Sequence, residues 1–565
     1  MKRFISNSHL SYSDDFFKTS KIAFEGVNSF TVKFPYLYAE KLVDERQQKI
    51  ALFVSPLNTT SYKFTKCQFP FPDLGDLNYQ ILDTSHGQTF VLVNHWSKNS
   101  NFGHLYMSDS IGARFSLSLK YVPKTDKDFF DFSKVAGLEG VYLANHYKEE
   151  LFERGLGATG GNVKESYKQK LTKITFNRGG TWLPVSAPEK DSLGRKISCE
   201  DESCSLHLNV AALTDIGHLY SSKNAIGLLV STGNVGYKLP TKTGEINTYV
   251  SRDSGMTWSE LAKGSNIYET GDHGSFLVFG SDQKSSNTIS YSIDEGQTVD
   301  SLKIASKFEV YDMMSEPSNV ASHFLAVGMT SDEQGMTVSM DFSNFFPRMC
   351  DPSSTGNTTD YEEWSPHSAH SLSSCVLGRK ISITRKKQGA KCFNGEKFDR
   401  KKVVENCVCS QEDWECDLGW SRVKEGSCKR SDGSTELDFT KPEKCLVYYT
   451  VSQGYRKVTG DSCESGVDLA PLRVPCPGSS GIGDYLGKLF IFLLLTSILL
   501  YLYSTGKASD LLSGAIPLVQ SFIPSSFNPI NGLGSSSNSN SNSNELGGMK
   551  AGSLFEDNED DEEED

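Results

Sequence analysis

The sequence predicts an all-β protein of the β-propeller class, followed by a disulfide-rich module, one transmembrane helix and a disordered acidic tail. Three observations support this: a turn motif that recurs among short strand-like runs, ten cysteines between Cys350 and Cys476, and an apolar run from Leu489 to Tyr503. A chain of 565 residues has room for several domains. We expect them at 1–345, 346–480, 485–503 and 504–565.

The region before residue 346 contains short apolar runs bounded by Gly, Asn, Asp and Ser, a pattern typical of β-strands and turns. Between these runs, a turn of the form S-x-D-x-G-x-T-W recurs. Residues 251–258 match it at every position, 175–182 have Asn for Asp, and 292–299 lack the aromatic residue; degenerate copies begin at Ser13 and Ser108. In such an Asp-box, the carboxylate accepts backbone N–H groups and the Gly adopts a positive φ. Repeated copies between strands indicate propeller blades, with unrelated hairpins of a sandwich as the alternative.

The region 346–480 is rich in cysteine. A dense, even set is typical of a disulfide framework in an oxidising compartment. Zinc is the alternative, but the stretch lacks C-x-x-C, and His367 and His370 are the only histidines nearby. We therefore predict five disulfides, with the pairing left open, among Cys350, Cys375, Cys392, Cys407, Cys409, Cys416, Cys428, Cys445, Cys463 and Cys476.

Three further cysteines precede this region. Cys199 and Cys204 are close enough to form a short disulfide loop, while Cys67 is left over as a buried thiol or as the partner of a cysteine upstream. The N-terminus has no apolar segment typical of a secretory signal. Because a disulfide-rich ectodomain needs such a signal, we expect that N-terminal sequence is missing.

The apolar run is the predicted membrane anchor. Extended back to Tyr485 it has 19 residues with Lys488 as the only charge, close to the ~20 that a bilayer requires. A buried core helix is the alternative. The flanking charges do not set the orientation, so we place the cysteines and the sequons at Asn58 and Asn357 on the lumenal side.

The tail after the apolar run contains eleven acidic residues and two lysines, and therefore carries −9 of the net charge of −13. Nine of the ten residues 556–565 are acidic, and Ser553 fits an acid-directed phosphorylation site. A Ser- and Asn-rich segment precedes them, typical of disorder. We expect the acidic cluster to recruit cytosolic trafficking adaptors; a tail that only aids solubility is the alternative.

Several stretches resemble the sortilins and the yeast vacuolar sorting receptor, notably residues 131–143, 407–420 and 454–463. The likeness runs from about residue 10 through the apolar run. The resemblance implies a ten-bladed propeller, of which this chain would hold about half, then a ten-cysteine module that supports it. It also implies binding of soluble lumenal protein or peptide cargo, with vacuolar or lysosomal hydrolases as the expected class, and transport from Golgi to endosomes.

The resemblance also implies a ligand pocket inside the propeller. Tyr106, Ser108 and Tyr142 match pocket-lining positions, although an ordinary role as strand residues is an equal alternative. A basic residue that would bind a ligand carboxylate falls near Leu117, so Arg114 or Lys120 is the expected substitute.

Other functional classes are disfavoured. The chain is acidic and has no phosphate-binding loop, so we expect no nucleic-acid partner. Asp-boxes also mark sialidases, which need an arginine triad, but Arg178 and Arg252 lie within turns. We therefore expect binding rather than catalysis, without cofactor or metal. A cell-surface receptor that binds signalling peptides is the alternative.

Overall fold

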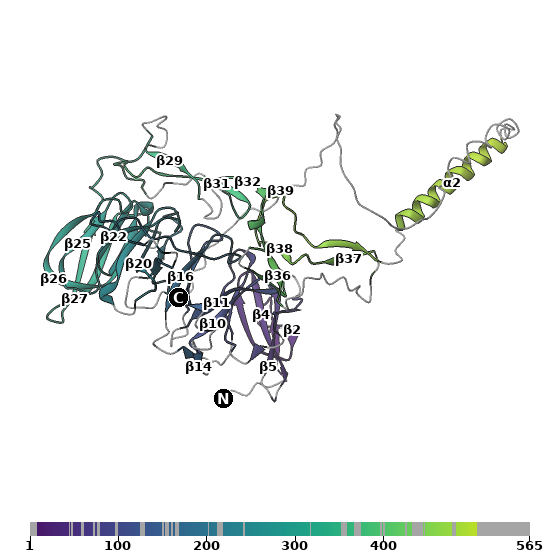
Figure 1. Ribbon diagram of the computed structural model, residues 1–565, viewed down its shortest axis with the longest axis horizontal. Helices are drawn as coiled ribbons and strands as arrows, with labels where there is room; N and C mark the ends of the chain where they lie inside the picture. Colours follow the sequence, from purple (N-terminus) through teal and green to yellow (C-terminus); the bar gives the residue numbers. More distant parts are fainter. Residues whose placement is uncertain are drawn as a thin grey trace. The chain divides into compact units, whose positions relative to one another are not determined.

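The computed structural model describes residues 8–504 except for gaps, the longest of which are 125–129, 153–157, 164–168, 212–217, 352–358, 367–374, 432–444 and 477–481. The chain divides into two units, Met1–Pro477 and Gly478–Asp565. The first unit is built from β-sheets joined by turns and short 3-10 segments (Figure 1).

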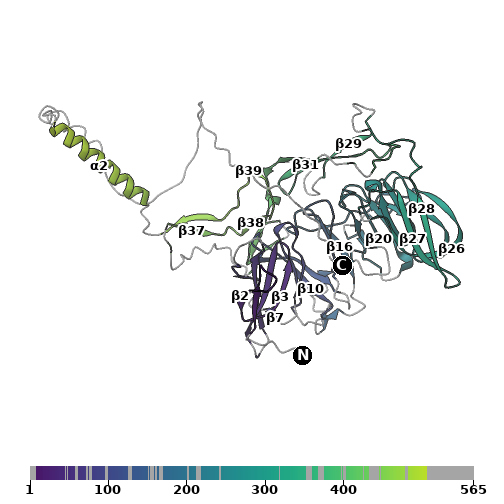
Figure 2. The same cartoon turned by 180° about the vertical axis from the view of Figure 1, so that it is seen from behind.

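Four antiparallel sheets follow one another in chain order (Figure 1, Figure 2). Consecutive strands pair in each of them, except that β7 pairs with β5 in the first sheet and β18 pairs with β20 in the fourth. The first sheet contains β3 (Val27–Lys33), β4 (Tyr36–Asp44), β5 (Lys49–Pro56), β6 (Thr65–Lys66) and β7 (Leu74–Gly75). The second contains β8 (Tyr79–Asp83), β9 (Phe90–Val93), β10 (Phe102–Ser108) and β11 (Phe115–Pro123).

The third sheet contains β12 (Phe132–Lys134), β13 (Tyr142–Tyr147), β16 (Lys170–Thr175) and β17 (Leu183–Pro184). The fourth contains β18 (Ser205–Leu208), β19 (Tyr220–Ser221), β20 (Leu229–Gly236), β21 (Asn247–Ser251) and β22 (Ser259–Ala262). Two-stranded sheets are formed by β1 (His9–Tyr12) with β2 (Lys21–Glu25) and by β14 (Ala158–Thr159) with β15 (Asn162–Val163).

A six-stranded sheet follows. It contains β23 (Asn266–Gly271), β24 (Phe276–Ser281), β25 (Ser286–Ser292), β26 (Asp300–Met314), β27 (His323–Thr330) and β28 (Gly335–Asp341). Residues Asp300–Phe308 of β26 pair with β25, and Phe308–Met314 pair with β27. This single long strand therefore joins three strands on one side, β23 to β25, to two strands on the other, β27 and β28.

The hydrophobic core lies between consecutive sheets. Side chains on the two faces of each strand point in opposite directions, so a strand packed between two sheets is apolar on both faces. β13 shows this, because all six of its residues are buried. Tyr142 and Ala144 pack with Leu105 of the second sheet, whereas Leu143 packs with Leu206 of the fourth. Face-to-face packing of successive antiparallel sheets of four or five strands confirms the all-β, propeller-like fold.

The recurrent turns have the predicted geometry. In the turn between β21 and β22, the Asp253 carboxylate accepts the Thr257 N–H at 2.8 Å and the Ser251 hydroxyl at 2.8 Å. Gly255 has a φ of +94° and its N–H donates to Ser251 Oγ. The turns after β16 and β25 repeat these contacts with Asn177 and Asp294 as the acceptors. In these sheets the Asp-box connects the third and fourth strands in sheet order, whereas the copy that begins at Ser13 joins β1 to β2.

The cysteine-rich module follows β28 and consists of short strands. They are β29 (Tyr361–Trp364), β30 (Cys375–Val376), β31 (Arg379–Lys386), β32 (Lys402–Asn406), β33 (Val408–Cys409), β34 (Trp414–Cys416), β35 (Trp420–Arg422), β36 (Cys428–Arg430), β37 (Tyr448–Val451), β38 (Tyr455–Lys457), β39 (Glu464–Gly466) and β40 (Leu472–Pro475). The 3-10 segments among the described residues of the first unit are η1 (Ser85–Gly87), η3 (Thr243–Glu245), η4 (Asp272–Gly274) and η6 (Gln411–Asp413).

All ten cysteines of the module are paired, which leaves no thiolate among them for zinc. The disulfides are Cys350–Cys392, Cys375–Cys407, Cys409–Cys463, Cys416–Cys428 and Cys445–Cys476. The short loop expected earlier in the chain is closed by Cys199–Cys204. Cys67 is a buried free thiol whose Sγ lies 3.7 Å from the carbonyl oxygen of Gly112.

In the second unit, α2 runs from Ile482 to Ser504. Among the side chains that the structure describes, no helix is long and apolar enough to cross a membrane. The predicted span 485–503 includes side chains outside that description, as does the predicted tail, so both stay predictions.

Candidate functional site

The cysteine-rich module contacts the Asp-box turns of four successive sheets. The contacts involve the turns between β10 and β11, β16 and β17, β21 and β22, and β25 and β26. In each case a module side chain or carbonyl group meets a residue of the turn. We name this region the turn face, because it is the end of each sheet at which the Asp-boxes lie.

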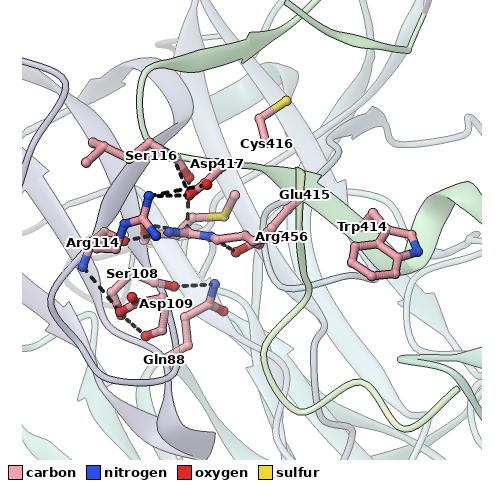
Figure 3. A network of polar contacts seen from close by, with 12 residues as sticks. Gln88, Ser108, Asp109, Arg114, Ser116, Trp414, Glu415, Cys416, Asp417 and Arg456 are labelled. Atoms are coloured by element: carbon pink, nitrogen blue, oxygen red, sulfur yellow. Dashed lines mark hydrogen bonds and ion pairs between the residues drawn. The ribbon is translucent and has the colours of Figure 1, made fainter. Parts of the chain in front are cut away.

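The first contact joins the β10–β11 turn to β34 and the residue after it (Figure 3). The Arg114 Nη2 atom lies 3.1 Å from the Asp417 Oδ1 atom, and the Asp417 side chain is only 3% exposed. Asp109 is the Asp-box carboxylate of this turn, because its Oδ1 atom accepts the N–H groups of Ala113 and Arg114. The turn therefore holds Arg114 where it can neutralise a buried module carboxylate.

Arg456 of β38 completes this contact (Figure 3). Its Nε donates to Glu415 Oε1 at 2.6 Å, and its Nη1 donates to the carbonyl oxygen of Arg114 at 2.6 Å. Its Nη2 donates to Met107 O and Ser116 Oγ, each at 3.1 Å. One guanidinium thus binds two strands of the second sheet and one carboxylate of the module.

Glu415 is fully buried. Burial raises the pKa of its carboxyl group, while the neighbouring Arg456 acts in the opposite direction. Because an unpaired buried carboxylate is costly, Arg456 is required for Glu415 to be tolerated at this position. The charged groups of this contact serve to hold the module against the sheet.

The second contact surrounds Arg178 in the β16–β17 turn. Its side chain is 1% exposed, forms an ion pair with Glu139, and donates from Nη1 to the carbonyl oxygen of His86 at 2.7 Å. Glu139 also binds Arg379 of β31, with 2.8 Å between Oε2 and Nη2. Burial, together with Arg379, lowers the pKa of Arg178 to about 10. At Gly460, which has a φ of +76°, an added Cβ would lie 2.7 Å from Arg178 Nη2.

The third contact involves the next two turns. Arg385 Nη1 donates to the carbonyl oxygen of Arg252 at 2.8 Å, and Arg252 forms an ion pair with Glu295. Gln388 Nε2 donates to the carbonyl oxygen of Asp294 at 3.1 Å. Both Asp-box arginines noted in the sequence, Arg178 and Arg252, therefore have structural partners.

Of the four residues expected to line a ligand pocket, three are buried. Tyr106 in β10 places its hydroxyl 2.8 Å from His95 Nε2. The Ser108 hydroxyl accepts the N–H of Thr89 at 2.8 Å. The Tyr142 hydroxyl donates to Asp83 Oδ2 at 2.8 Å.

Tyr106, Ser108 and Arg114 lie together on β10 and its turn, whereas Tyr142 begins β13 of the next sheet. Leu117 pairs with Tyr106 in the sheet, and Lys120 forms an ion pair with Glu149. These positions give each side chain a contact within the protein, and the proposed ligand role of the four residues stays a prediction. Three predicted modification sites, Asn58, Asn357 and Ser553, lie outside the described residues.

The module residues that contact the turn face were not predicted from the sequence. Glu415 and Asp417 flank Cys416, and Arg456 is the third residue of the stretch 454–463. The signal available was charge: these residues are charged and lie among cysteines and aromatic residues that have to be buried. Charged residues in such a setting require partners.

Comparison with known proteins gives the family. The family model described as Sortilin, neurotensin receptor 3 matches residues 2–313, and its C-terminal counterpart matches residues 315–476. The chain belongs to the sortilin family. The two matches meet near the end of β26, and the second covers the whole cysteine-rich module.

Two curated relatives illustrate the similarity. Vacuolar protein sorting/targeting protein 10 of Kluyveromyces lactis is 33% identical over 487 residues, which are 82% of this chain and 30% of the relative. The Sortilin-related receptor of Homo sapiens is 31% identical over 509 residues, 82% of this chain and 21% of that protein. The chain therefore spans less than a third of each of these relatives. Neither relative is named as an enzyme.

A likeness to solved enzyme structures is weak. A Trypanosoma rangeli sialidase in complex with the inhibitor DANA is 10% identical, with a TM-score of 0.20, and the match covers 67% of this chain and 68% of that one. A score this low carries no argument about fold or activity.

Proposed function

We propose that this chain is part of a type I transmembrane sorting receptor, which binds soluble cargo in the Golgi lumen and carries it to endosomes. The observation that supports this most strongly is the turn face: propeller-like sheets held by a ten-cysteine module, in a chain of the sortilin family. Curated relatives are named for vacuolar sorting and as a sortilin-related receptor. Vacuolar or lysosomal hydrolases are the proposed cargo class.

The proposed topology places everything before residue 485 in the lumen. Disulfides persist in oxidising compartments, so six of them in the first unit support this side. The apolar run 485–503 would anchor the chain, and residues 504–565 would reach cytosolic adaptors through the acidic cluster.

A protease-protection experiment tests the topology. Protease added to sealed vesicles should remove only the segment after residue 503, and a glycosidase should change the mobility of the protected fragment through Asn58 and Asn357. The variants Asn58→Gln and Asn357→Gln should each remove part of that mobility change. Digestion of the cysteine-rich module in sealed vesicles would contradict the lumenal assignment.

Sorting itself is tested through cargo. Cells that lack the receptor should secrete a vacuolar hydrolase, and the receptor should restore its retention. Replacing residues 556–565 with Ser and Asn should move the receptor from Golgi and endosomes to the vacuole or cell surface, while Ser553→Ala should give a weaker shift. Retention of cargo without the receptor, together with receptor at the cell surface, would favour a peptide-binding signalling receptor instead.

A further inference from the structure

A cavity of about 200 Å³ lies between the third and fourth sheets. It is lined by the end of β13, the start of β16, the start of β18 and the residue after β20. In β13 and β16, Tyr142 pairs with Thr175 next to the Asp-box turn, whereas Tyr147 pairs with Lys170 at the other end. The cavity therefore lies at the ends of these strands opposite the turn face, away from the strand ends that the module contacts.

The cavity combines cations, an aromatic ring and apolar surface. Lys148 and Lys173 supply two amino groups among the lining residues. The lining residues that the structure describes include no carboxylate, although Glu149 lies near enough to Lys173 to act on its pKa. Tyr237 is 63% exposed and Leu171 is partly buried. Ser203 and Ser205 flank Cys204, so the Cys199–Cys204 disulfide restrains this part of the rim. Such a lining favours an anion attached to an apolar group.

His146 supplies an acceptor without a partner. Its side chain is 7% exposed and lines the cavity, and its Nδ1 atom lies 3.0 Å from the carbonyl oxygen of Tyr147. Because a carbonyl oxygen can only accept, Nδ1 carries the proton and Nε2 presents a lone pair. This Nε2 atom is buried and has no hydrogen-bond partner. Burial, with Lys173 nearby, lowers the pKa of His146 to about 3, so the ring stays neutral and Nε2 stays an acceptor.

Two neighbouring residues that line the cavity have their polar atoms satisfied. His207 Nδ1 accepts the N–H of Thr172 at 3.2 Å, and its Nε2 lies 3.1 Å from the carbonyl oxygen of Gly236. The Thr172 hydroxyl donates to Asn145 Oδ1 at 2.6 Å. Of these three residues, only His146 has a ring nitrogen that lacks a hydrogen-bond donor, and this residue lines the cavity together with the two lysines.

We propose that this cavity binds a carboxylate of peptide cargo, with Lys173 contacting the carboxylate and His146 Nε2 accepting an adjacent N–H. A peptide provides this combination in two ways, as its C-terminal residue or as an internal Asp or Glu beside its own amide. The volume is below the ~300 Å³ of ordinary small-molecule pockets, so the cavity admits a single residue. Tyr237 and Leu171 contact the apolar part of that residue. This inference rests on the proposed cargo-binding function and adds a binding site to it.

Calorimetry on the full chain in detergent, with three probes, tests the proposal. The probes are N-acetylglycyl-leucine as the free acid, its carboxamide, and N-acetyl-aspartate N-methylamide. At least one of the two acids should bind about tenfold or more tightly than the carboxamide, a difference of about 1.4 kcal/mol. Preference for the first acid identifies a C-terminal residue as the ligand, and preference for the second identifies an internal acidic residue.

Variants connect the binding to the cavity. Lys173→Gln should weaken binding of the preferred acid at least about tenfold, because it removes a charge-assisted hydrogen bond. Tyr237→Ala should weaken it severalfold, since the exposed ring is lost without disturbing the core. Lys284→Gln, at an exposed lysine between β24 and β25, is the matched control and should leave binding unchanged.

Three results would overturn the proposal: equal binding of acid and carboxamide, no binding of any probe at millimolar concentration, or unchanged binding by Lys173→Gln. Each of these leaves the sorting function to be judged separately by cargo secretion. If the hydrolase is retained by the Lys173→Gln and Tyr237→Ala receptors as by the parent, the receptor function stands and only this site is wrong.

Discussion

Arg114 and Asp417 form an ion pair across 303 residues of chain, with 3.1 Å between Nη2 and Oδ1. Arg114 belongs to an Asp-box turn of the second sheet, and Asp417 follows the strand β34 of the cysteine-rich module. In the next two Asp-box sheets, Arg178 shares Glu139 with Arg379 of the module, and the carbonyl oxygen of Arg252 accepts a hydrogen bond from Arg385. The Asp-box thus does more than close a hairpin here, because it presents groups that bind the module.

Removing the charge of Arg114 should loosen this attachment. Arg114→Leu leaves the nearly buried Asp417 without its guanidinium partner, although Ser452 still donates to Asp417 Oδ2. Because Arg114 itself is half-exposed, we expect a loss of about 0.5–1.5 kcal/mol in the free energy of unfolding, measured by chemical denaturation. Arg195→Leu removes an ion pair within one turn and should cost less, because Asp191 keeps Lys263 as a second cationic partner. An equal loss in the free energy of unfolding for the two variants would show that the ion pair with the module stabilises the protein no more than an ion pair within one turn.

Gly460 lies against the buried Arg178 and cannot carry a side chain without displacement. In Gly460→Ala, the Cβ atom would lie 2.7 Å from Arg178 Nη2 at a backbone φ of +76°. We expect a loss of about 1–3 kcal/mol and increased protease cleavage of the module. Gly389→Ala is the matched control, because an added Cβ there meets no atom within 4 Å. If Gly460→Ala leaves the free energy of unfolding unchanged, the Arg178 side chain can move away from the added Cβ atom without destabilising the protein.

The Asp-box turns could be predicted from sequence because they are local. Ser251, Asp253 and Gly255 make all their decisive contacts within the same turn, so the residue pattern contains the geometry. The even cysteine count likewise predicted disulfides, but not that Cys409 bonds to Cys463, since ten cysteines permit many pairings.

The partners of Arg114 and Arg456 could not be predicted in the same way. They depend on where the module lies against the sheets, and no local pattern encodes a contact across several hundred residues. The same reason applies to Tyr106 and Tyr142, whose hydroxyl partners, His95 and Asp83, come from neighbouring strands and sheets. The cavity at His146 depends on the pairing of two sheets and gave no sequence signal.

Asp461 should make stability depend on pH. Burial, together with the neighbouring Asp413 carboxyl, raises its pKa from 3.8 to about 7. The folded state then binds a proton more tightly than the unfolded state, so the free energy of unfolding should fall as pH rises from about 4 to about 7. Asp461→Asn does not titrate and should flatten this slope, whereas Asp468→Asn, at an exposed carboxyl of the module, should not. A parent protein that becomes more stable over this pH range would contradict the assignment.

The disulfides should differ in their contribution to stability according to the length of chain they close. Cys409–Cys463 spans 54 residues and Cys199–Cys204 spans five. Loop entropy alone predicts about 4 kcal/mol for the first and about 2 kcal/mol for the second. The paired variants Cys409→Ser with Cys463→Ser, and Cys199→Ser with Cys204→Ser, should therefore differ by about 2 kcal/mol in the free energy of unfolding, measured by chemical denaturation.

Because the Cys409–Cys463 bond also joins β33 to the segment before β39, its loss should make the module accessible to protease, while loss of the Cys199–Cys204 bond should leave the module protected. Peptide mapping without reduction checks the pairing directly, and a bond between Cys409 and any cysteine other than Cys463 would show that the module is connected differently.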